Sequence, residues 1–168
     1  VWILVGQVIG FVALGDLGIA NAVGREVARA LGEGNEDDAR RIVATATTLL
    51  TLAGGAVAAV TFGLAPHVPP VLRIPAAHAA DARPVFTIAG LSLAAQFPLR
   101  VGFGILAGHQ RYAAANLSRL ASAALTLAGV LGLAATRRLD LVSLAALSAI
   151  ASIVTQAVML AAALRSVG

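Results

Sequence analysis

The sequence contains no cysteine and no lysine, and it has few charged residues of any kind. Without cysteine, the chain can form neither a disulfide framework nor a thiolate metal site. Only 12% of its 168 residues are charged, which is about half the share found in a typical soluble domain. So few charges cannot cover a chain of this length with a solvated surface. Together with 59% hydrophobic residues and a mean hydropathy of +0.90, this predicts a membrane protein.

All twelve basic residues are arginine, and the chain carries a net charge of +4. A basic chain can indicate nucleic-acid binding. Here, however, the arginines stand at the ends of apolar segments and do not line one soluble helical face. We therefore exclude nucleic acid as a partner.

Long apolar segments alternate with short polar links along the whole chain. At ~1.5 Å per residue, a helix of about 20 residues crosses a ~30 Å hydrocarbon core. Five segments qualify, over about 1–20, 42–64, 84–108, 113–135 and 141–164. They lack the period-two alternation of barrel strands. The sequence thus predicts an all-α, polytopic transmembrane helical bundle with five spans. Because it starts inside an apolar run, we expect a fragment of a longer protein.

The polar links differ in character. Residues 21–41 have the pattern of an amphipathic hairpin, with apolar residues on one helical face and charges on another. Gly32 and Gly34 suit the end of its first helix, and Asn35 suits the N-cap of the next. The segment 65–83 holds four of the six prolines, which predicts a non-spanning loop with a short helix over 76–82.

Arginine is unevenly shared between the two sets of links. Seven arginines fall on the side of the hairpin and four on the other side, and an excess of arginine marks the cytoplasmic side. The bias therefore predicts a cytoplasmic hairpin and an extracytoplasmic 65–83 loop. The two sets are Arg25, Arg29, Arg40, Arg41, Arg111, Arg119 and Arg165 against Arg73, Arg83, Arg137 and Arg138.

The remaining arginine lies deep inside a span. Arg100 precedes Gly108 by eight positions, so a helix would place it roughly 12 Å below the membrane boundary. An arginine at that depth must face protein or a water-filled cavity. Either it contacts an anionic headgroup, as Gln96 one turn earlier also could, or a structural carboxylate neutralises it. Asp16 is either that carboxylate or a helix-end residue at the interface.

Other polar residues recur at helical spacing inside the spans. Such stripes line cavities or form hydrogen bonds between helices. They are Arg41, Thr45 and Thr48 in the second span, Asn116 and Arg119 in the fourth, and Ser148, Ser152 and Gln156 in the last. No nucleotide-binding, metalloprotease or serine-hydrolase motif occurs, and the three histidines are not at ligand spacing. We therefore expect no enzyme activity, no cofactor and no metal.

Two stretches are similar to parts of one transporter family. The first is "WILVGQVIGFVALGDLGIANAVGREVARALGEGNEDDARRIVATATTLLTLAGG", and the second is "RVGFGILAGHQRYAAANLSRL". They resemble the second and third helices, and the link from the fourth to the fifth helix, of bacterial polysaccharide-exporting flippases. These flippases belong to the multidrug, oligosaccharidyl-lipid and polysaccharide exporter superfamily.

The resemblance implies a two-lobed flippase with six helices in each lobe. This chain would supply helices two to six of the N-terminal lobe, and its partners would be the missing first helix and the second lobe. Such flippases move an undecaprenyl-pyrophosphate-linked oligosaccharide across the bacterial inner membrane by alternating access, through a cationic central cavity. The glycan would serve surface polysaccharide, such as lipopolysaccharide or exopolysaccharide.

The resemblance also implies where the substrate binds. The candidate headgroup and cavity residues are Arg100, Gln96, Asp16, Arg25, Arg41 and Arg119. Three alternatives stay open: a drug or cation antiporter, a flippase for the peptidoglycan-precursor lipid, and a membrane scaffold that transports nothing. An antiporter should carry acidic residues in mid-span, for which Asp16 is the one candidate.

Overall fold

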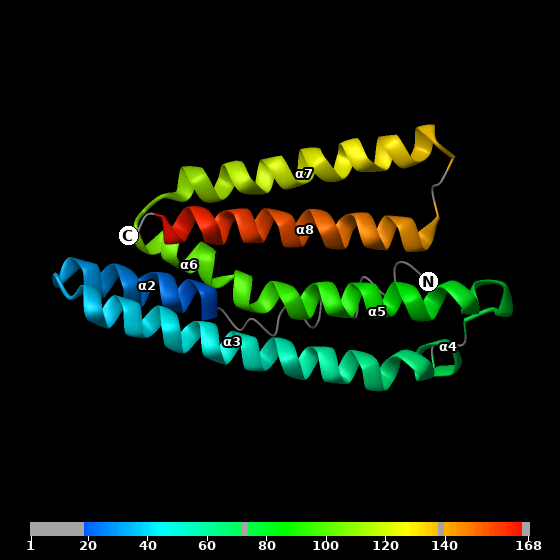
Figure 1. Ribbon diagram of the computed structural model, residues 1–168, viewed down its shortest axis with the longest axis horizontal. Helices are drawn as coiled ribbons and strands as arrows, with labels where there is room; N and C mark the ends of the chain where they lie inside the picture. The colour runs from blue at the N-terminus through cyan, green and yellow to red at the C-terminus, as the bar shows by residue number, and fades with distance from the viewer. Residues whose placement is uncertain (1–18, 72–73, 138–139, 166–168) are drawn as a thin grey trace.

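The computed structural model describes residues 19–71, 74–137 and 140–165, and every element in these ranges is helical (Figure 1). The elements are α2 (Ile19–Gly32), α3 (Glu36–Leu64), the 3₁₀ turn η2 (Ala65–His67), α4 (Val68–Val71), α5 (Ala76–Leu99), α6 (Val101–Gly108), α7 (Tyr112–Ala135) and α8 (Leu141–Leu164). The prediction of an all-α chain is thereby confirmed.

Within the described residues, four helical stretches are long and apolar enough to cross a membrane. They are Glu36–Val71, Ala80–Gly108, Asn116–Ala135 and Leu141–Leu164. Each overlaps one of the last four spans expected from the sequence. The first expected span, 1–20, lies outside the described residues except for its last two positions, and Asp16 lies outside them as well.

The proline-rich segment 65–83 is more helical than the sequence suggested. The chain passes from α3 through η2 into α4, and α5 already begins at Ala76. The short helix expected over 76–82 is therefore the first part of a spanning helix. Pro84 lies inside α5, where it cannot donate to the carbonyl of Ala80, and the helix nevertheless continues through it.

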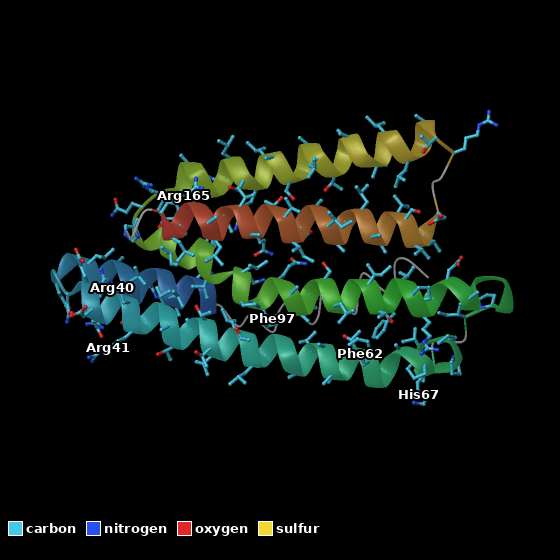
Figure 2. All side chains as sticks on the ribbon, in the orientation of Figure 1. Arg40, Arg41, Phe62, His67, Phe97 and Arg165 are labelled. Carbon is cyan, nitrogen blue, oxygen red and sulfur yellow. The ribbon has the colours of Figure 1, made fainter. Side chains whose placement is uncertain are left out.

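The helices form a layered bundle (Figure 1). The antiparallel pair α7 and α8 packs through α8 onto α5, and α5 packs onto α3. The short helices α2 and α6 pack against each other near one end, where the α2–α3 and α6–α7 links also lie. Arg40, Arg41 and Arg165 are at that end, and His67 is at the opposite end (Figure 2). The arginine-rich links thus share one end of the bundle.

The hairpin between α2 and α3 is defined by its helix caps. The Asn35 side chain accepts a hydrogen bond from the backbone N–H of Asp38 at 3.1 Å, which confirms the predicted N-cap. Gly34 has a φ of +71°, and the N–H groups of Gly34 and Asn35 donate to the carbonyls of Leu31 and Ala30. This is the Schellman pattern, in which the left-handed residue is usually glycine.

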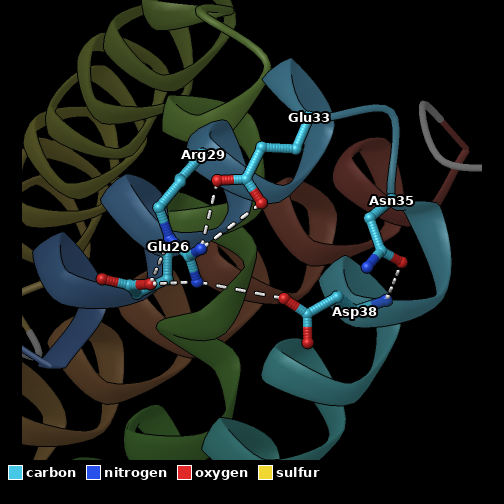
Figure 3. Close-up of polar contacts among 5 residues, drawn as sticks. All are labelled: Glu26, Arg29, Glu33, Asn35 and Asp38. Atoms are coloured by element: carbon cyan, nitrogen blue, oxygen red, sulfur yellow. Dashed lines mark hydrogen bonds and ion pairs between the residues drawn. The ribbon is translucent and has the colours of Figure 1, made fainter.

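An exposed ion cluster surrounds Arg29 at the same hairpin (Figure 3). Its guanidinium lies 3.0 Å from Glu26, 3.3 Å from Glu33 and 3.9 Å from Asp38 of the next helix. The hydrogen bond to Glu26 and the charge of Glu33 raise the pKa of Arg29 above its usual value. Because water screens these pairs, they orient the hairpin more than they stabilise it.

The other two tight turns use the same left-handed backbone without glycine. Gln110 has a φ of 57° after α6, and Arg137 has a φ of 54° after α7. The next helix, α8, is capped by Asp140, whose carboxylate accepts the N–H of Ser143 at 2.6 Å. That bond lowers the pKa of the Asp140 carboxyl below its usual value.

A glycine sets the close approach of α3 to α5. Gly54 is buried, and a Cβ atom on it would lie 2.5 Å from the carbonyl oxygen of Ala94. Pro98, four residues after Ala94, has no N–H to donate to that carbonyl. The two backbones can therefore meet where the proline interrupts the α5 ladder, which places the end of α5 against α3.

We expect Gly54→Ala to lower the stability of the fold, because the added methyl group would meet backbone and not a movable side chain. Overpacking of this kind costs about 1–3 kcal/mol. Gly55→Ala is the matched control, since nothing lies within 4 Å of a Cβ at that exposed site. Thermal unfolding of the purified protein in detergent measures both, and equal midpoints for the two variants would contradict the packing argument.

Candidate functional site

A polar cavity of about 740 Å³ lies among α2, α5, α6, α7 and α8. Its lining consists of Asn21, Gln96, Arg100, Phe103, Ser118, Arg119, Ser122, Ala123, Ser152, Thr155, Gln156 and Met159. Most of these side chains are polar, although the chain as a whole is 59% hydrophobic. A polar cavity inside an apolar bundle is the strongest candidate for a binding site.

Arg100 reaches the cavity from the break between α5 and α6. Because Pro98 cannot donate its backbone nitrogen, the α5 ladder ends here. The backbone N–H of Arg100 is shared between the carbonyls of Gln96 and Phe97, at 3.1 and 3.2 Å. Its guanidinium carbon lies 5.5 Å from the centre of the buried Phe97 ring. Arg100 is half-buried at the junction of α5 and α6. The fold therefore holds its charge at a defined position.

Two glutamines join α5 to α8 at the wall of the cavity. The amide nitrogen of Gln156 donates to the side-chain oxygen of Gln96 at 2.9 Å. Gln96 in turn donates to the hydroxyl of the buried Ser92 at 3.0 Å. This chain of bonds satisfies polar groups that would otherwise be costly inside a membrane bundle.

Arg119 enters the cavity from the other side, on α7. Its guanidinium carbon lies 4.9 Å from the centre of the Phe103 ring on α6. The two cavity arginines thus come from different helices, and each lies over a phenylalanine. The described lining residues thus include two arginines and no aspartate or glutamate.

The structure separates the six candidate residues into three groups. Arg100, Gln96 and Arg119 line the cavity together. Arg25 and Arg41 are exposed and are not among its described lining residues, and their role in binding stays a prediction. Asp16, with its pairing to Arg100, falls in the part of the chain that the structure does not describe.

The stripe at Arg41, Thr45 and Thr48 does not contribute to this cavity. Thr45 and Thr48 are exposed on α3, and the Thr48 hydroxyl bonds to the Ala44 carbonyl of its own helix at 3.0 Å. In contrast, Ser152 and Gln156 of the other stripe do line the cavity. Helical spacing therefore identified polar faces but not the direction in which they point.

Sequence reasoning missed several lining residues. Ser118 and Ser122 are spaced by four on α7, so the periodicity that identified the α8 stripe could have found them. Phe103 gave no such signal, because its partner Arg119 comes from another helix. In the described ranges no group of three histidine, cysteine, aspartate or glutamate residues is placed to hold a metal ion.

The Gln96–Gln156 bond should contribute to stability as a coupled pair. We expect Gln96→Leu and Gln156→Leu each to lower the thermal midpoint, and the double variant to lose less than the sum. The coupling expected for such a bond between membrane helices is about 0.6 kcal/mol, with an upper value of about 1.7 kcal/mol. Strictly additive losses in this double-mutant cycle would show that the two amides act independently.

Comparison with known proteins places this chain in a transporter family. A model of the MatE family matches residues 3–130, which is more than half of the chain and contains α2, α3, α5, α6 and most of α7. No curated protein and no solved structure matches the chain. The match confirms the superfamily expected from the sequence. The chain therefore belongs to the MatE family and is a multi-pass membrane protein of the superfamily of multidrug and polysaccharide exporters.

Proposed function

We propose that the chain is part of a flippase that moves an undecaprenyl-pyrophosphate-linked oligosaccharide across the bacterial inner membrane by alternating access. One observation carries the proposal: the cavity combines two guanidiniums with neutral hydroxyl and amide groups. The product would serve cell-surface polysaccharide, such as lipopolysaccharide or exopolysaccharide. In this proposal the chain supplies helices two to six of an N-terminal lobe, which works with a first helix and a second lobe.

The positive part of the cavity suits a pyrophosphate. A bare pyrophosphate cannot cross hydrocarbon, because an unpaired charge loses its hydration without compensation. Arg100 and Arg119 can replace that hydration with charge-assisted hydrogen bonds, for which the guanidinium fork is well matched to phosphate oxygens. The phosphates would therefore bind between α6 and α7.

The neutral part of the cavity suits a sugar. Ser118 and Ser122 line it from α7, and Ser152 and Thr155 line it from α8. Hydroxyl groups both donate and accept hydrogen bonds, as the hydroxyl groups of a sugar do. Hydroxyl groups of this kind can exchange hydrogen bonds to water for hydrogen bonds to a sugar with little loss of free energy. The glycan is thus proposed to bind beside the pyrophosphate, toward α8.

The alternatives differ in what they need from the cavity. A drug or cation antiporter needs a carboxylate to exchange a proton or sodium ion, and none of the described lining residues is acidic. A flippase for the peptidoglycan-precursor lipid would use the same anionic headgroup chemistry, so it stays a second candidate. A scaffold would gain nothing from two arginines beside a polar cavity.

The cavity arginines provide the test of function. In the full-length transporter, we expect Arg100→Ala and Arg119→Ala each to reduce export of surface polysaccharide about tenfold or more, because a hydrogen bond to a charged group is worth about 1.5–3 kcal/mol. Arg83→Ala, which removes an exposed arginine of α5 that is not among the described lining residues of the cavity, is the control. Surface polysaccharide is quantified at matched protein levels in the membrane.

The result of this export assay distinguishes between the candidate functions. Normal polysaccharide in Arg100→Ala would contradict the headgroup role. Loss of cell-wall synthesis with intact surface polysaccharide would favour the peptidoglycan-precursor lipid.

The arginine bias predicts that the α2–α3 hairpin lies in the cytoplasm. This orientation can be tested independently of the substrate. This chain has no cysteine, so a single introduced cysteine is its only thiol. We expect a cysteine at Glu33, in the α2–α3 hairpin, to resist a membrane-impermeant thiol reagent added from the periplasm. A cysteine at His67, which is exposed at the opposite end, should react readily (Figure 2). The reverse labelling pattern would invert the proposed topology.

A further inference from the structure

Phe103 lies beside both arginines of the cavity. It follows Arg100 by one turn, and its backbone N–H donates to the Arg100 carbonyl at 3.1 Å. Its ring lies under the guanidinium of Arg119, and all three residues line the cavity. We propose that Phe103 is a positioning residue, which holds Arg119 toward the cavity so that an anionic headgroup can bind there. This inference rests on the proposed function.

The ring is placed by a rigid part of the fold. Its neighbours Val101, Gly102, Gly104 and Ile105 in the short helix α6 are all buried. A Cβ atom on Gly102 would lie 2.7 Å from the Cα atom of Leu160, so α6 is in close backbone contact with α8. Phe103 therefore gives Arg119 a fixed surface to lie on.

Arg119 needs such a surface, because its own helix does not enclose it. The residue is exposed on α7, three positions after the start of the apolar span at Asn116. Arginines near the end of a span tend to extend outward to the membrane interface. A ring centre within about 6 Å attracts the guanidinium, and here the separation is 4.9 Å. The contact thus opposes the outward extension.

Stacking on a ring keeps the arginine available to an anion. A carboxylate partner would cancel its charge, as Glu26 and Glu33 do for Arg29 at the hairpin. No ion pair involving Arg119 occurs within the described residues. A phenyl ring attracts the guanidinium without cancelling its charge and accepts none of its N–H donors in a conventional hydrogen bond. Stacking and phosphate binding are therefore compatible.

The test measures binding directly and does not depend on export. Purified full-length protein in detergent is titrated with farnesyl diphosphate, and with farnesol as the uncharged probe. For farnesyl diphosphate we expect Phe103→Leu to raise Kd about 3- to 30-fold, the range for loss of one cation–π contact at tenfold per 1.4 kcal/mol. Phe103→Tyr, which keeps the ring, should restore the Kd to within about twofold. Farnesol binding should not change.

Two further variants distinguish positioning from a structural role. Phe62→Leu removes an exposed aromatic ring of α3 and should bind like the wild type. If Phe103 acts through Arg119, then Phe103→Leu should weaken binding no further in an Arg119→Ala background. The thermal midpoints of the ligand-free variants show that all of them are folded.

The results separate this role from the proposed function. Wild-type affinity in Phe103→Leu, failure of Phe103→Tyr to restore binding, or additive losses in the double variant would overturn the positioning role and leave the proposed function standing. A wild-type protein that binds farnesyl diphosphate no better than farnesol would overturn both.

Discussion

The structure depends on how one charged residue is accommodated inside an apolar span. Arg100 stands where Pro98 ends the hydrogen-bond ladder of α5 and where α6 begins. A break in a spanning helix frees backbone groups, and an arginine at that place needs a polar or aromatic environment. The cavity and the buried Phe97 ring supply it. The position of the break therefore fixes where the polar interior of the bundle must be.

Close packing on one side of the break leaves space on the other. Gly54 brings α3 against α5, and Gly102 brings α6 against α8. In contrast, within the described residues α7 packs mainly against α8 and less against α6, and none of its spanning window is buried. The bundle is thus dense around α5 and α6 and loose toward α7. The polar cavity occupies this loose side.

The outer surface of the bundle suits lipid. Large apolar side chains are exposed along α3, α7 and α8, including Leu52, Leu120 and Ile150. In water such a surface would promote aggregation, whereas in a bilayer it costs nothing because lipid tails are equally apolar. The charged residues of the described chain correspondingly lie toward the helix ends and in the cavity. This distribution is the one expected of a transporter of the MatE family.

The sequence by itself determined the local structure of the chain. The length and apolar character of the segments predicted the spanning helices, and Asn35 predicted the start of α3, because both depend on residues adjacent in the chain. The depth of Arg100 predicted, for the same reason, a charge that faces protein or a water-filled cavity. Only the tertiary structure decided which polar faces meet. It brought Gln156 to Gln96 and Arg119 to Phe103, and it left Arg41 outside the cavity. Helical periodicity shows that residues share a face, but the packing of helices distant in sequence determines what that face contacts.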